Sequence, residues 1–62
     1  MTLSDIIARK GRWRLQRWGD PEEGQGCYSI RYDHPERGLV EEYVGVDLEK
    51  TKEKFGELSC SH

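Results

Sequence analysis

The chain has 62 residues, of which 34% are hydrophobic and 35% are charged, with a formal net charge of −2. This length predicts one domain that buries only about 60% of its unfolded surface, so we expect no deep, enclosed substrate cavity of roughly 300 Å³ or more. The mean hydropathy of −0.93 is low enough to raise the question of disorder. Aromatic residues in alternating patterns favour a folded domain, and partial disorder until a partner binds is the alternative.

The first expected element is a short helix over residues 5–10. Ser4 is a suitable N-cap, Asp5 suits the first turn, and Gly11 suits the position after the last turn. Ile6 and Ile7 would be its apolar contacts. A helix of this length is not stable alone, so we expect it to dock on the rest of the domain.

Two strands are expected next, over residues 12–18 and 27–32, because apolar and polar residues alternate there. Residues 19–26, rich in glycine and acidic side chains, read as a long hairpin loop, for which a contact role is an open alternative. One face of the two strands would carry Trp13, Leu15, Tyr28, Ile30 and Tyr32. The other would carry Arg12, Arg14, Trp18, Cys27 and Arg31.

A third strand is expected over residues 39–46, after a turn at residues 33–38. The alternation places three valines (Val40, Val44, Val46) on the core face and Leu39, Glu41 and Tyr43 on the other face. Glu42 falls among the valines. Either it lies at an exposed edge, or a bulge near residues 41–42 shifts the register.

A second helix is expected from about Leu48, with Asp47 as its cap and Gly56 near its end. Its apolar stripe would be Leu48, Thr51, Phe55 and Leu58. The predicted fold is α+β, a three-stranded antiparallel meander with both helices on one face (α-β-β-β-α). Residues 1–58 would form the domain and residues 59–62 a disordered tail. The expected core comprises Trp13, Leu15, Tyr28, Ile30, Tyr32, Val40, Val44, Val46, Leu48, Phe55 and the isoleucines.

The sheet face away from the helices is the expected binding surface. Arginine binds carboxylate or phosphate and stacks on aromatic rings, and Arg, Trp and Tyr dominate interface hot spots. A solvated face with Arg14 or Arg31 paired to Glu41 is the alternative. We predict a small non-enzymatic adaptor or regulatory protein that binds another protein, or a second copy of itself. The predicted contact residues are Arg12, Arg14, Trp18, Arg31 and Tyr43.

Nucleic-acid binding by the same face is the alternative function, with Lys50 and Lys54 adding phosphate contacts, since sheets of this kind can enter grooves. The sequence pI of about 5.6 argues against it, because nucleic-acid-binding domains usually exceed a pI of about 9. The charge is unevenly distributed: residues 19–62 hold eleven of the twelve acids, and residues 1–18 hold half of the ten bases. This split indicates either an interaction surface or charge pairing within the domain, with the basic strand lying beside acidic ones.

Catalytic and metal sites are not expected. Cys27 and His34 are the only nucleophile–base pair, and no orienting group accompanies them. The spacings among Cys27, His34, Cys60 and His62 match no zinc pattern. We therefore predict no enzyme activity, cofactor, metal, small-molecule substrate or membrane contact. No targeting segment is visible, so we expect a cytoplasmic protein with reduced cysteines, and a Cys27–Cys60 disulfide is the alternative.

Overall fold

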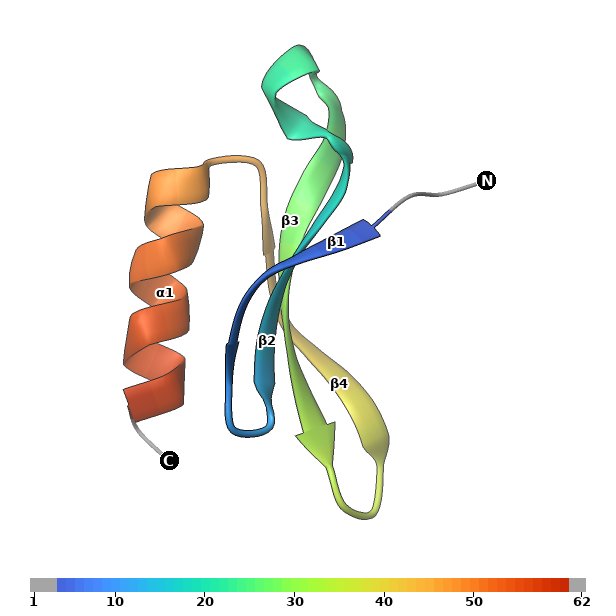
Figure 1. Ribbon diagram of the computed structural model, residues 1–62, viewed down its shortest axis with the longest axis vertical. Coiled ribbons are helices and arrows are strands. Elements are labelled where there is room, and N and C mark those ends of the chain that lie inside the picture. The colour runs from blue at the N-terminus through green and yellow to red at the C-terminus, as the bar shows by residue number, and fades with distance from the viewer. Residues whose placement is uncertain (1–3, 61–62) are drawn as a thin grey trace.

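The computed structural model describes residues 4–60, which form an α+β fold of two layers (Figure 1). Its antiparallel sheet has four strands in the order β1-β2-β3-β4, and α1 covers one face of that sheet. The prediction of an α+β fold with a C-terminal helix is confirmed. The prediction of three strands and an N-terminal helix is wrong. The elements are β1 (Ser4–Lys10), β2 (Trp13–Asp20), the 3₁₀ turn η1 (Pro21–Glu23), β3 (Gln25–His34), β4 (Gly38–Gly45) and α1 (Leu48–Cys60).

Strand β1 replaces the helix expected over residues 5–10. Ile6 and Ile7 are β-branched, which favours a strand. Asp5 lies opposite Arg17 of β2 and its carboxylate accepts a hydrogen bond of 2.8 Å from that guanidinium. Gly11, with φ +60°, turns the chain into β2 rather than ending a helix. Neither isoleucine reaches the core, because both are 40% exposed or more.

The hairpin between β2 and β3 is longer than predicted. Pairing continues to Asp20 opposite Gln25, so only η1 and Gly24 form the loop. Gly19 adopts φ +64°, and a side chain at Gly26 would overlap the carbonyl oxygen of Trp18. Two glycines at these positions let the strands stay paired to the end of the hairpin.

A bulge in β4 changes which residues face the helix. Ile30 of β3 lies opposite Tyr43, but Arg31 lies opposite Glu41, so Glu42 is the extra residue. Both alternatives for Glu42 are therefore confirmed, because it is the bulge residue and is also exposed on the edge strand β4. The shift turns Tyr43 toward the helix side, where it packs against the core, and leaves Val44 52% exposed. The expected core positions of Val44 and Val46 are wrong for this reason, since Val46 is 69% exposed.

The core lies between α1 and the central strands. Trp13, Leu15, Tyr28 and Ile30 are buried there, as predicted. The Trp13 and Tyr32 rings also lie 4.8 Å apart, centroid to centroid. The half-buried residues around this cluster are Ala8, Tyr32, Tyr43, Leu48, Phe55 and Leu58.

Helix α1 begins as predicted and ends later. The backbone N–H of Lys50 donates to Oδ1 of Asp47 at 3.2 Å, so Asp47 is the cap. The helix passes through Gly56 and continues to Cys60, and Ser59 is buried. The tail expected over residues 59–62 is thus wrong for its first two residues, and residues 61–62 lie outside the described part. Among residues 4–60, no helix is long and apolar enough to cross a membrane.

Candidate functional site

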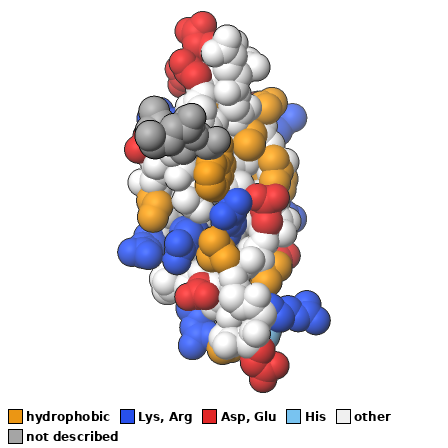
Figure 2. All heavy atoms as spheres, turned by 90° about the vertical axis from the view of Figure 1, so that its right-hand side faces the viewer, with side chains coloured by type: hydrophobic (Ala, Val, Ile, Leu, Met, Phe, Trp, Pro, Cys, Tyr) orange, Lys and Arg blue, Asp and Glu red, His pale blue; other side chains and the backbone are white. Residues whose placement is uncertain are grey.

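Three arginines lie side by side on the sheet face that α1 leaves uncovered, which we call the bare face. Arg9 of β1 lies opposite Arg14 of β2, and Arg14 lies opposite Arg31 of β3. These residues form the arginine row, which Glu41 of β4 ends opposite Arg31. Figure 2 shows the bare face, with basic side chains across its middle and hydrophobic side chains beside them.

Two members of the arginine row have no acidic partner. The Arg31 guanidinium lies 3.3 Å from the carboxylate of Glu41. Among residues 4–60, no carboxylate lies within ion-pair distance of Arg9 or Arg14, although Arg14 is half-buried. Like charges directly opposite each other destabilise a sheet. The bare face therefore holds two guanidinium groups available to an anionic ligand.

On the opposite face of the sheet, which α1 covers in part, the arginine of β2 has an ion-pair partner. Arg17 of β2 is paired with Asp5 at 2.8 Å. The hydrogen bond and the negative charge of Asp5 raise the pKa of the Arg17 guanidinium. Arg14 and Arg17 are three residues apart in one strand, so their side chains lie on opposite faces, and of these two only Arg17 has an ion-pair partner within residues 4–60.

Trp18 is held on the bare face by two side-chain contacts. Its indole N–H donates to the hydroxyl of Ser29 at 2.7 Å, and the Arg31 guanidinium lies 4.8 Å from the ring centroid. This distance is within the range of a cation–π interaction. Two buried polar atoms beside Trp18 have no hydrogen-bond partner within residues 4–60. Oε1 of Gln16 accepts no hydrogen bond, and the N–H at Nε of Arg31 donates none. Trp18, Ser29 and Arg31 thus form one connected cluster.

Aliphatic side chains border this cluster. Ile6 lies opposite Gln16, and Val44 lies opposite Ser29, so both belong to the bare face. Ile6 is 48% exposed and Val44 is 52% exposed. The bare face consequently combines unpaired cations, a stacked indole and exposed aliphatic groups.

The five predicted contact residues are only partly brought together. Arg14, Trp18 and Arg31 lie on the bare face, as expected. Arg12 lies in the exposed turn between β1 and β2, and Tyr43 lies on the helix side because of the bulge. Sequence reasoning missed Arg9, Ile6 and Val44. The β-branched pair at residues 6–7 was the signal for β1 that would have placed Arg9 on the sheet.

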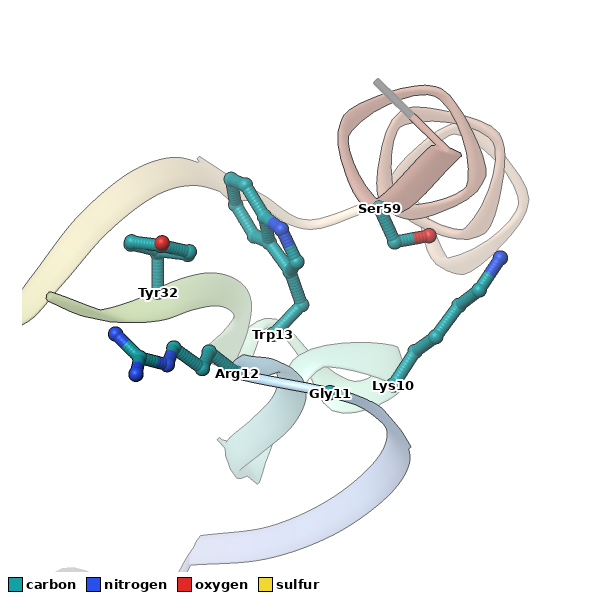
Figure 3. Close-up of a pocket in the computed structure, with 6 residues that line it drawn as sticks. All are labelled: Lys10, Gly11, Arg12, Trp13, Tyr32 and Ser59. Carbon is teal, nitrogen blue, oxygen red and sulfur yellow. The ribbon is translucent and has the colours of Figure 1, made fainter. Parts of the chain in front are cut away.

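A second feature is a surface cleft on the helix side, shown in Figure 3. Its volume is about 430 Å³, and it is an open surface cleft rather than an enclosed cavity. Lys10 extends along the side of the cleft at Ser59, and Arg12 extends along the side at Tyr32. Another hollow of about 340 Å³ adjoins it and shares Trp13 and Tyr32.

The weighed catalytic and metal residues do not converge. Cys27 lies opposite Trp18 on the bare face, whereas His34 contacts Tyr32 on the helix side. Nδ1 of His34 accepts backbone hydrogen bonds from Glu36 and Arg37 at 3.1 and 3.2 Å, which closes the turn after β3. Cys27 and Cys60 are free thiols. Residues 4–60 contain no cluster of three potential metal ligands, and His62 lies outside them.

Comparison with known proteins adds no family. The sequence matches no family model, and neither a curated protein nor a solved structure is significantly similar to it. The function is therefore inferred from the residues of the bare face.

Proposed function

We propose that this protein is a small, non-enzymatic adaptor or regulatory protein that binds a protein partner through the bare face. The observation that carries the proposal is the arginine row, in which Arg9 and Arg14 face solvent without carboxylates of their own. The partner supplies carboxylates to these guanidinium groups. No catalytic step, cofactor or metal takes part, and binding occurs in a reducing cytoplasm.

The aliphatic residues favour a protein partner over nucleic acid. Ile6 and Val44 lie beside the arginines and are about half exposed. A protein surface offers carboxylates and apolar side chains together, and arginine next to apolar groups is typical of interface hot spots. A phosphate backbone would leave the aliphatic groups without a counterpart.

The position of α1 also weakens the nucleic-acid alternative. Its residues Leu48, Phe55 and Leu58 pack on the covered face of the sheet, so Lys50 and Lys54 lie on the other side of the molecule from the arginine row. They cannot add phosphate contacts to the bare face. A gel-shift titration at two salt concentrations tests this alternative, because phosphate contacts weaken steeply with salt. Saturable, salt-sensitive binding that Arg14→Ala abolishes would support it.

Site-specific photo-crosslinking tests the proposed function. A photoreactive residue replaces Val44 on the bare face in one protein and Glu36 in the β3–β4 turn in a control protein. Both are exposed to lysate of the source cells, with and without prior nuclease treatment. We expect discrete protein adducts at position 44 that are absent at position 36. Equal adducts at both positions, or adducts that disappear after nuclease treatment, would contradict the proposal.

A further inference from the structure

The outward side of α1 carries a stripe of glutamates. Glu49, Glu53 and Glu57 follow one another at spacings of four, and all three are exposed. The residues that pack against the core, including Leu48 and Phe55, lie on the other side of the helix. We call these three glutamates the acidic stripe.

Part of the acidic stripe is uncompensated. Glu57 lies 3.9 Å from Lys54. Among residues 4–60, neither Glu49 nor Glu53 lies within ion-pair distance of a cation. The helix layer thus carries two carboxylates that have no ion-pair partner. The sheet layer carries two guanidinium groups, those of Arg9 and Arg14, that also have none.

The spacings of the two sets are compatible. Residues four apart on a helix are separated by about 6 Å along its axis, and neighbouring strands lie about 4.8 Å apart. Glutamate and arginine side chains are long enough to take up a difference of about 1 Å. Two consecutive carboxylates on a helix laid across the strands therefore reach two consecutive members of the arginine row.

We propose that the bare face binds α1 of a second copy of this chain, with Glu49 and Glu53 paired to Arg9 and Arg14. This inference rests on the proposed function, because it uses the arginine row as a protein-binding surface. The two complementary surfaces lie on opposite layers of the molecule, one on the bare face of the sheet and the other on the outward side of α1 (Figure 1). Each copy that binds through one layer leaves the other layer open.

Such a contact is heterologous, so the copies join head to tail and the assembly continues beyond a dimer. The helix of the bound copy crosses the strands of the receiving copy, whereas α1 runs alongside the strands of its own sheet (Figure 1). Successive copies are therefore rotated relative to one another, and the product is an open stack. The contact is mainly between charges, so it weakens with salt.

Sedimentation equilibrium of the full chain with charge-reversed variants tests the inference. We expect the average mass of the wild type to rise with concentration beyond that of a dimer at low salt. It should fall to the monomer at about 0.5 M NaCl, where the Debye length is roughly 4 Å. Arg9→Glu alone and Glu53→Arg alone should remain monomeric. Their equimolar mixture should form a 1:1 dimer and stop, because each retains one intact surface.

Arg37→Glu is the matched control, since it makes the same charge change in the β3–β4 turn. It should associate like the wild type. Both Arg9 and Glu53 are exposed, so their replacement leaves the core intact. Circular dichroism checks this, and Arg14→Glu gives a second sheet variant.

The results separate the two proposals. A mixture that stays monomeric, or a wild type that stops at a dimer, would overturn the head-to-tail contact. Crosslinking of foreign proteins at position 44 would then still support the proposed function. Loss of association in Arg37→Glu as well would also overturn the specific pairing.

Discussion

The two faces of the sheet are built from alternate residues of the same strands. On the covered face, Leu15 lies opposite Ile30, and both are at most 1% exposed. One residue away, Arg14 lies opposite Arg31 on the bare face. The first pair stabilises the domain by burying apolar surface. The second pair brings like charges together, which lowers stability.

This difference indicates that the bare face carries side chains that do not stabilise the fold. A 62-residue domain has little core. Even so, Ile6 and Val44 stay exposed, and Oε1 of Gln16 is buried without a hydrogen-bond partner in the described chain. All these features lie on the bare face. They are expected of a surface whose partner is another molecule.

The largest expected effect comes from the covered face. Ile30→Ala should lower the free energy of unfolding by about 2–5 kcal/mol, because it leaves a cavity at a residue that is 0% exposed. A domain of this size has only about 3–9 kcal/mol in total, so much of the variant should be unfolded. Urea denaturation followed by circular dichroism measures this. Val44→Ala is the bare-face control and should change stability by less than about 0.5 kcal/mol. Equal losses of unfolding free energy in the two variants would contradict the claim that only the covered face stabilises the domain by burying apolar surface.

A smaller effect is expected at the Trp18 cluster. Ser29→Ala removes the acceptor of the 2.7 Å hydrogen bond from the indole and should cost about 1 kcal/mol. The same denaturation experiment measures the loss, and a changed Trp fluorescence should accompany it. An unchanged stability and emission spectrum would mean that Trp18 is not held against Ser29.

The smallest effect is expected in the arginine row and has the opposite sign. Arg9→Gln should raise the free energy of unfolding by up to about 0.5 kcal/mol at low salt, because it relieves repulsion with Arg14. The gain should disappear at high salt. Arg17→Gln, which breaks the pair with Asp5, should instead lower stability. If both substitutions lower stability, Arg9 has a stabilising role that the contacts do not account for.

The sequence predicted the central strands, the core and the start of α1, because these depend on local patterns. Trp13, Leu15, Tyr28 and Ile30 alternate strictly, and Asp47 precedes an apolar stripe. Each pattern requires only neighbours in the chain, so no knowledge of tertiary pairing was needed.

The errors arose where pairing between strands decides the structure. Residues 5–10 carry helix-capping signals, but the cross-strand pair of Asp5 and Arg17 belongs to a sheet. The bulge at Glu42 depends on the register against β3, and it exchanged the faces of Tyr43 and Val44. The arginine row was only partly predicted for the same reason, since Arg9 joins it through the pairing of β1 with β2.

The most direct test of the proposed site measures crosslinking at position 44 in arginine variants. Arg9→Gln and Arg37→Gln remove the same charge, one from the arginine row and one from the distant β3–β4 turn. We predict that Arg9→Gln reduces the yield of protein adducts roughly tenfold, a loss typical of removing one charge-assisted contact, while Arg37→Gln leaves it unchanged. Equal yields in the two variants would contradict the claim that the arginine row binds the partner.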